Sequence, residues 1–219
     1  VHQYSDGHAV LTWYPYLERN IYSDPSTWLV YAICGYIKES GDIAYLYEKM
    51  PYLDGGTATV LDHLKQAVRW FVKKENGGPN GLPKIYHADW NDALNIPDEN
   101  AESVLMGMLV CKVYDEMIEL SDYIGDKQYS DRIKRNKQLL VERINNTAYN
   151  GEYYVRALTS FGKIGDKDSE NGGKIYVNPQ SWSILAGVCP KNRLQSVINA
   201  MDGMETEEGI PLCSPAYKS

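Results

Sequence analysis

The sequence lacks the long apolar run that a membrane-spanning helix requires. A bilayer span needs roughly 18 consecutive apolar residues, whereas the longest apolar stretch, around residues 28–37, is broken by Tyr31, Gly35 and Tyr36. The first residues, Val-His-Gln, carry no charged segment followed by an apolar one, which is the pattern of a secretory signal peptide. We therefore expect neither a membrane partner nor secretion.

Paired cysteines and clustered metal ligands are also missing. The four cysteines, Cys34, Cys111, Cys189 and Cys213, stand far apart with no CxxC pair, which in a chain of 219 residues indicates free thiols in a reducing compartment. The four histidines show no HxH or HxxxH spacing, and the acidic loops lack a glycine where a calcium loop needs it. These absences predict a cytoplasmic protein with no metal and no cofactor.

The excess positive charge that nucleic-acid binding requires is absent as well. The sequence has 22 Lys and Arg against 29 Asp and Glu, a formal net charge of −7, and no basic stripe. Phosphate backbones would on balance be repelled, so we exclude nucleic acid as a partner. No GxSxG, P-loop or GxGxxG motif occurs, so the local signatures of serine hydrolases and of nucleotide sites are missing too.

What the sequence does contain is apolar residues at helical spacing over most of its length. A helix is predicted from Ser26 and Thr27, which can cap it, to about Gly41. The same pattern predicts further helices over residues 42–50, 57–76, 102–123, 126–146, 180–188 and 192–201. The other segments are predicted as polar loops at 80–100 and 160–173 and a short strand or extended stretch at 152–158.

Two of these predicted helices differ in how far they should be buried. Residues 102–123 are apolar almost all round, which predicts a helix covered on most faces, whereas residues 126–146 carry many charges and a single apolar stripe. A buried helix followed by an amphipathic one is the pattern expected when an inner ring of helices is wrapped by an outer ring. The pattern therefore favours an array of helical hairpins.

The loop at residues 86–95 concentrates the side chains that carry chemistry. Asp89, Trp90, Asn91 and Asp92 stand consecutively between two predicted helices. An indole packs on the apolar face of a sugar ring while carboxylates and amides hydrogen-bond its hydroxyls, so this composition, in a chain with 18 Tyr, suits a carbohydrate site. A network of Asx turns and helix caps around a buried Trp uses the same residues, and composition alone leaves both interpretations open.

Residues 89–95 resemble the "GDWNDGMN" signature of glycoside hydrolase family 94, the cellobiose and chitobiose phosphorylases. Five further segments are similar to family motifs and stand in the family's order: residues 2–15, 23–32, 36–42, 151–157 and 180–182. The resemblance implies an all-α fold that is part of an (α/α)6 barrel. It also implies that residues 1–219 are a partial catalytic domain, from which the N-terminal β-sandwich and the C-terminal portion of the barrel are absent.

The activity that the resemblance implies is inverting phosphorolysis of a β-linked gluco-disaccharide or oligosaccharide, with inorganic phosphate as co-substrate. The resemblance assigns the general acid to Asp92 and substrate binding to Trp90, Arg19 and Asp24, and Asn91 is a candidate ligand of the sugar hydroxyls. The chemistry agrees, because an inverting hydrolase needs a second carboxylate to activate water whereas phosphate is itself an anionic nucleophile. Asp92 must then carry its proton near neutral pH, which requires burial or neighbouring negative charge.

The sequence departs from the family pattern beside the candidate residues. Ile21 and Pro25 stand where the family has a second Arg and a second Asp. The identity of the donor sugar therefore cannot be inferred from the family. Asp89 either adds negative charge next to Asp92 or braces the loop. The family's phosphate-binding motifs follow a segment matched here by residues 211–217, so the chain holds the candidate acid without the phosphate site.

Two expectations follow for the chain as a whole. Because seven or so helices cannot close a barrel of twelve, we expect the chain alone to be inactive and to associate, as a homo-oligomer or with the missing half of its barrel. The alternative to an enzyme is a non-catalytic α-helical carbohydrate-binding or scaffold module derived from the same barrel.

Overall fold

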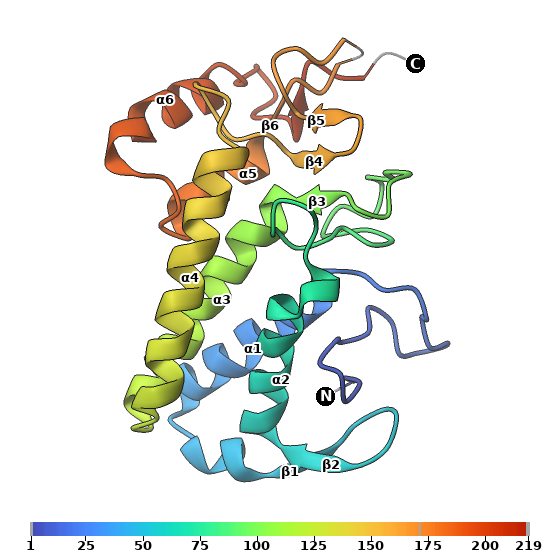
Figure 1. Ribbon diagram of the computed structural model, residues 1–219, viewed down its shortest axis with the longest axis vertical. Coiled ribbons are helices and arrows are strands. Elements are labelled where there is room, and N and C mark those ends of the chain that lie inside the picture. Colours follow the sequence, from blue (N-terminus) through green and yellow to red (C-terminus); the bar gives the residue numbers. More distant parts are fainter. Residues whose placement is uncertain (1, 171, 218–219) are drawn as a thin grey trace.

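Three pairs of helices joined by short strands make up the chain. The computed structural model describes residues 2–170 and 172–217 (Figure 1). Its α-helices are α1 (Pro25–Ser40), α2 (Val60–Val72), α3 (Val104–Tyr123), α4 (Lys127–Thr147), α5 (Val177–Leu185) and α6 (Lys191–Asp202). Two 3-10 helices, η1 (Ile43–Tyr47) and η2 (Lys74–Asn76), accompany them. Over these described ranges, the search for a helix long and apolar enough to cross a bilayer finds none.

The expectation of an all-α fold is wrong in part, because three small antiparallel sheets accompany the helices. One sheet pairs β1 (Lys49–Pro51) with β2 (Thr57–Thr59), the second is β3 (Glu102–Ser103), β4 (Ala157–Thr159) and β5 (Gly162–Ile164), and the third pairs β6 (Ile175–Tyr176) with β7 (Cys213–Ser214). Only the end of the stretch predicted as extended at 152–158 is a strand, and the loop predicted at 160–173 contains β5. These strands are two or three residues long, too short to leave a period-two pattern in the sequence.

Most of the predicted helices are confirmed. Those predicted from Ser26 to Gly41 and at 102–123, 126–146 and 192–201 correspond to α1, α3, α4 and α6, and the helix predicted at 180–188 begins earlier, at Val177. The first of them ends as predicted at Gly41, whose φ of 68° lies in the left-handed region that favours glycine.

The helix predicted at residues 42–50 is a tight turn followed by a strand. The Asp42 carboxylate accepts a hydrogen bond from the Tyr45 backbone N–H at 3.3 Å and caps the 3-10 helix η1. The chain then enters β1, which pairs with β2 instead of extending the helix. A strand partner that follows only after a loop is a non-local feature, so helical spacing within 42–50 did not reveal it.

The helix predicted at residues 57–76 is shorter at both ends. Its first residues form β2, and α2 begins at Val60, where the Thr59 hydroxyl and the Asp62 carboxylate form a capping box. It ends at Val72, and η2 follows. The prediction began the helix too early because the capping box was not recognised, and it ended the helix too late because it included the separate 3-10 helix η2.

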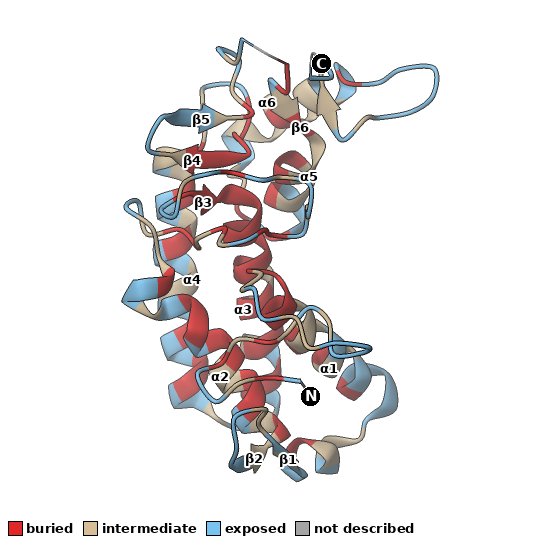
Figure 2. Ribbon diagram, turned by 90° about the vertical axis from the view of Figure 1, so that its right-hand side faces the viewer, coloured by how far each residue is buried: buried red, intermediate tan, exposed pale blue. Residues whose placement is uncertain are grey.

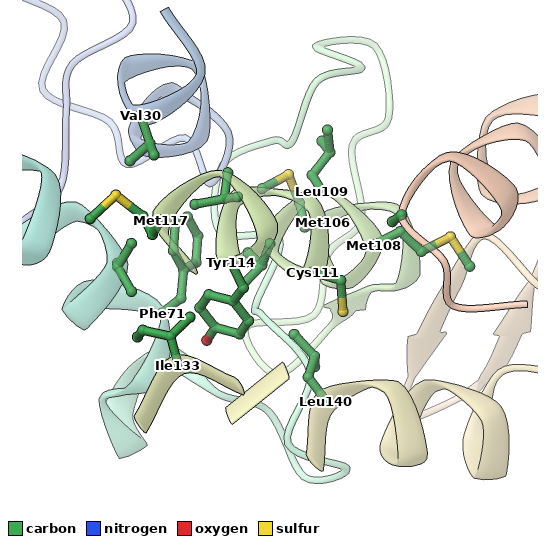
Figure 3. Packing of buried hydrophobic residues seen from close by; sticks show 14 of the residues in the cluster. Val30, Phe71, Met106, Met108, Leu109, Cys111, Tyr114, Met117, Ile133 and Leu140 are labelled. Atoms are coloured by element: carbon green, nitrogen blue, oxygen red, sulfur yellow. The ribbon is translucent and has the colours of Figure 1, made fainter. Parts of the chain in front are cut away.

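The apolar core is centred on α3, as the sequence predicts. This helix packs against α1, α4 and α5, and Figure 2 shows it buried along its length. Figure 3 shows its residues Met117 and Tyr114 packed among Phe71 of α2 and Ile133 of α4. By contrast, α4 buries one stripe and exposes the rest, which confirms the prediction that it is amphipathic. Each fully buried Leu or Met contributes about 1.5–3 kcal/mol, so α3 holds the helices together.

A buried carboxylate closes the turn that leads into the candidate loop. Glu102 of β3 is almost fully buried, and its Oε1 accepts hydrogen bonds from the backbone N–H groups of Asn80 and Leu82, both at 2.9 Å. Its Oε2 accepts from the Asn80 side-chain amide at 2.6 Å. Glycine is required at Gly78, because a Cβ there would lie 2.2 Å from Glu102 Cγ. The start of the loop is therefore fixed on β3.

We predict that Glu102→Ala lowers the free energy of unfolding by about 2–4 kcal/mol. The substitution leaves the backbone N–H groups of Asn80 and Leu82 without their acceptor, and that of Leu82 is buried, where an unsatisfied donor is costly. Urea denaturation measures the loss. The matched control is Glu119→Ala, whose exposed carboxylate pairs with Lys38 and should cost less than about 1 kcal/mol. Equal losses in the two variants would contradict the role given to Glu102.

Candidate active site

The backbone brings the two candidate motifs into one site. The His87 N–H donates to the Ile21 carbonyl and the Ser23 N–H donates to the Ala88 carbonyl, both at 3.0 Å. The Tyr22 ring meets the edge of the His87 ring, with 5.0 Å between centroids. The segment that carries Arg19 and Asp24 thus runs beside the segment that leads into residues 89–92.

The N-termini of two helices lie at this site. Asp24 is the N-cap residue of α1, and Ser103, which follows the candidate loop, is the N-cap residue of α3. The Ser103 hydroxyl accepts a hydrogen bond from the Met106 N–H at 3.0 Å, as an N-cap does. Partial positive charge at helix N-termini favours carboxylates nearby, which suits a site that contains several aspartates.

Asp89 braces the loop. Its Oδ1 accepts from Arg156 Nη2 at 2.6 Å and from the Asn91 backbone N–H at 3.0 Å, and its Oδ2 accepts from the Ser103 hydroxyl at 2.6 Å. Asp89 and Arg156 are 0% and 1% exposed. Burial acts to raise the pKa of Asp89, but the Arg156 guanidinium and the hydrogen bonds outweigh it and hold that pKa below its usual range. Of the two roles considered for Asp89, the contacts favour the brace.

Arg156 is the residue that the sequence prediction missed as a component of the site. It follows the apolar Val155 and carries a charge into the interior, and a charge in a buried segment requires a partner. That was the available signal, but the partner lies 67 residues away along the chain. The neighbouring Gln180 side chain holds the same segment by accepting from the Tyr154 N–H and donating to the Tyr154 and Tyr176 carbonyls.

Asp24 is a buried carboxyl group with one unused oxygen. It is 6% exposed, and its Oδ2 accepts from Trp28 Nε1 at 2.6 Å. Its Oδ1 has no hydrogen-bond partner among the described residues, and the same is true of the adjacent Ser23 hydroxyl. Burial raises the pKa of Asp24, and the negative charges of Asp89 and Asp92 add to the increase. An orphaned buried acceptor is costly unless a ligand completes it.

Trp90 and Asp92 point out of the loop that Asp89 holds. The Trp90 side chain is 48% exposed, so the interpretation of this loop as a cap network around a buried Trp does not apply to it. Asp92 is exposed, so the burial that we expected around the candidate acid is not supplied by residues 2–170 and 172–217. Asp92 lies near enough to Asp24 for its negative charge to raise the pKa of Asp24.

Asn91 and Arg19 are placed differently from each other. The Asn91 side-chain oxygen accepts from the Ala93 N–H at 3.1 Å, which is an Asx turn, so this atom serves the loop rather than a ligand. Arg19 is exposed and takes part in none of the ion pairs found among the described residues. Arg19 is therefore available to a ligand through its whole guanidinium group.

An open pocket of about 760 Å³ lies beside the candidate acid. Asn91 and Ala93, on either side of Asp92 in the sequence, form part of one wall. Phe161 and Tyr217 are among the residues of the β4–β5 hairpin and the last described segment that line it. This volume is in the range of small-ligand sites. Within the described ranges, no group of three or more His, Cys, Asp or Glu side chains is arranged to hold a metal ion.

The fold is similar to that of solved glycosidase structures. A family GH78 rhamnosidase of Bacillus sp. GL1 superposes with a TM-score of 0.63 over 86% of this chain and 18% of its own, at 16% identity. A rhamnosidase from Klebsiella oxytoca gives a TM-score of 0.64 over 94% of this chain and 36% of its own, at 12% identity. At such low identity the likeness concerns the fold alone. It defines a helix-rich domain of the kind found in glycosidases.

The family follows from the sequence match. Residues 16–219 match the family model "Glycosyl hydrolase 94 superfamily, catalytic domain", and the chain belongs to this family. It is 31% identical to solabiose phosphorylase of Paenibacillus borealis over 99% of this chain and 28% of that protein. It is 28% identical to N,N'-diacetylchitobiose phosphorylase of Vibrio proteolyticus over 90% of this chain and 24% of that protein. The chain thus spans about a quarter of the length of these relatives.

We predict that Arg156→Met lowers the free energy of unfolding at pH 7 by about 3–5 kcal/mol. Loss of one partner leaves the other charge of a buried pair uncompensated. The matched control, Arg135→Met, removes an exposed cation of α4 and should cost less than about 0.5 kcal/mol. Urea denaturation compares the two variants.

The same pair predicts a pH dependence with a defined sign. The pKa of Asp89 is lower in the folded protein than its unfolded value of about 3.9. The pair therefore stabilises the fold above about pH 4 and loses this contribution as the pH falls through the lower, folded-state pKa. The gap between wild type and Arg156→Met should narrow below about pH 4. A gap that is constant from pH 7 to pH 3 would contradict the ion pair.

Proposed function

We propose that this chain is the acid-bearing part of the catalytic domain of an inverting β-glycoside phosphorylase, and that its helix pairs belong to an (α/α)6 barrel. Family membership and relatives named as phosphorylases support the activity. The likeness to rhamnosidase structures and the buried α3 beside the amphipathic α4 support the barrel. The alternative of a non-catalytic carbohydrate-binding or scaffold module finds no support in the names of these relatives.

The observation that carries the proposal is that neighbouring residues of one loop differ in burial and hydrogen bonding. Asp89 is buried and fully hydrogen-bonded, while Trp90 and Asp92 on either side of Asn91 reach solvent, and Asp92 lies close enough to Asp24 to raise the pKa of that carboxyl group. A sugar ring can stack on the exposed face of the Trp90 indole. Its glycosidic oxygen then lies within reach of the Asp92 carboxyl.

In the proposed reaction Asp92 is the general acid. The bond between the anomeric carbon and the glycosidic oxygen breaks as the Asp92 proton passes to that oxygen, which leaves with the acceptor sugar. A phosphate oxygen forms the new bond to the anomeric carbon from the opposite face, so the configuration inverts and the product is a sugar 1-phosphate. We propose that Arg19 binds the transferred sugar, and that the side-chain NH2 of Asn91, whose oxygen accepts from the Ala93 N–H, does so too.

The substrate that we propose is a β-linked gluco-disaccharide or oligosaccharide. Relatives of comparable similarity carry the names of different disaccharides, so no single linkage is assigned. Pro25 and Ile21, the two residues that depart from the family pattern, have structural roles in this chain. Pro25 is buried in the first turn of α1, and the Ile21 carbonyl accepts a hydrogen bond from the His87 N–H. We further propose that the protein works in the cytoplasm as a homo-oligomer, with no cofactor besides the co-substrate phosphate.

We predict that Asp92→Asn in the full-length protein reduces phosphorolysis by about 10²–10⁴-fold and leaves sugar binding nearly unchanged. The amide keeps the shape of the side chain but cannot donate the proton, and a positioned general acid is worth this factor. Sugar 1-phosphate release from a panel of β-linked disaccharides measures the rate, and calorimetry measures binding. Glu99→Gln, an exposed carboxylate in the same loop, is the control and should retain activity. Turnover above about a tenth of wild type in Asp92→Asn would contradict the assignment.

We predict that Trp90→Ala raises the KM for the glycoside at least about tenfold while Tm changes by only a few degrees. The half-exposed indole contributes stacking area to the sugar and little to the core. The control is Tyr123→Ala, an exposed aromatic at the far end of α3, which should change neither quantity. A large fall in Tm with an unchanged KM would show that Trp90 is a structural residue.

A further inference from the structure

A groove between α2 and α4, which extends to the turn at residues 77–83, is lined by cations and apolar side chains. It consists of two adjoining pockets of about 400 Å³ and about 380 Å³, which share Val72 and Asn136. Val72 and Leu139 in its lining are half exposed. We call this surface the basic groove, and its charged lining residues are Lys65, Arg69, Lys73, Lys74, Arg132 and Arg143.

The charge of the basic groove is of one sign. All six charged side chains that line it are cations, although the whole chain has a formal net charge of −7. Only Lys65 has a carboxylate partner within the described part of the chain, namely Asp126 at 2.8 Å. Arg69 and Arg132 are exposed, and the Arg132 guanidinium lies over the Tyr129 ring, 4.8 Å from its centroid. The groove therefore fits an acidic partner that also carries an apolar side chain.

This chain carries a segment of that chemistry. After α6, residues 202–210 expose four carboxylates, those of Asp202, Glu205, Glu207 and Glu208. Reciprocal backbone hydrogen bonds between Thr206 and Gly209, at 3.0 and 3.1 Å, close a turn with Glu207 and Glu208 at its tip. None of the four carboxylates takes part in an ion pair found among the described residues, and Ile210 beside them is half exposed. We call residues 202–210 the acidic turn.

The acidic turn cannot reach the basic groove of its own molecule. Figure 1 places α6, which leads into the turn, near one end of the long axis, and α2, which forms one wall of the groove, in the opposite half. The two complementary surfaces of one chain therefore meet only between two molecules.

We propose that the basic groove of one copy of this chain binds the acidic turn of a second copy. The carboxylates of Glu207 and Glu208 pair with the guanidinium groups of Arg69 and Arg132, which have no carboxylate partner among the described residues, and Ile210 packs on Val72 and its apolar neighbours. Each copy has one groove and one turn, so the contact either closes reciprocally in a dimer or continues head to tail. The inference rests on the complementary charges and exposed apolar side chains of the two surfaces, and it supplies an interface for the homo-oligomer proposed above without depending on the proposed reaction.

Charge reversal tests the contact in the full-length protein by sedimentation velocity. Arg69→Glu/Arg132→Glu reverses the groove, and Glu207→Lys/Glu208→Lys reverses the turn. Each variant alone should associate at least about tenfold more weakly than wild type, because like charges then face each other. Mixed one to one, the two variants should associate again, since the reversed groove fits the reversed turn. Raising NaCl from about 0.05 M to about 0.5 M should weaken the wild-type association.

The control variant changes the net charge by the same amount as the groove reversal, but at other sites. Lys49→Glu/Lys191→Glu replaces two exposed cations outside the groove and should associate as wild type does. Circular dichroism verifies that each variant is folded. A monomeric wild type, reversal variants that still associate, a mixture that stays dissociated, or a control that is equally weakened would each overturn the proposal. Occupation of the groove by another acidic protein would appear as a wild type that is monomeric when purified.

Discussion

The buried ion pair between Asp89 and Arg156 is the constraint on which the candidate site depends. It joins a loop between α2 and α3 to the residue that precedes β4, and the Ser103 hydroxyl ties both to the first turn of α3. Two charges withdrawn from water persist only when each is neutralised and hydrogen-bonded. Because the pair meets this condition inside the core, the position of the loop is tied to the packing of α3. The fold and the site are therefore held by the same contacts.

The loop separates the residues that hold it from those that can react. Asp89 accepts hydrogen bonds from Arg156 and from the Asn91 backbone N–H, and the Asn91 side-chain oxygen accepts from the Ala93 N–H. These contacts hold both groups in place and leave neither free to bind a ligand. Trp90 and Asp92 make no comparable contact and reach solvent. A general acid, the role proposed for Asp92, needs rigid support and free approach together, and alternating held and free residues along four positions provides both.

The parts of this molecule that depend on local order were predictable, and the parts that depend on distant partners were not. The buried α3 and the amphipathic α4 follow from apolar spacing, and Gly41 marks the end of α1. The strands at Lys49–Pro51 and Ala157–Thr159 exist because remote segments pair with them, which spacing does not reveal. The exposure of Trp90 and the brace at Asp89 likewise needed the position of Arg156, a residue that the sequence marked only by its charge among apolar neighbours.

The backbone pairing of residues 21–23 with 86–88 has a consequence for which substitutions this region tolerates. The pairing uses main-chain N–H and carbonyl groups, so side chains on both segments can be exchanged without breaking it. Ile21 contributes only its carbonyl, which accepts from the His87 N–H. The side chains on these segments can therefore change at little cost in folding, and one backbone frame can carry different sets of side chains beside the loop that holds Asp92.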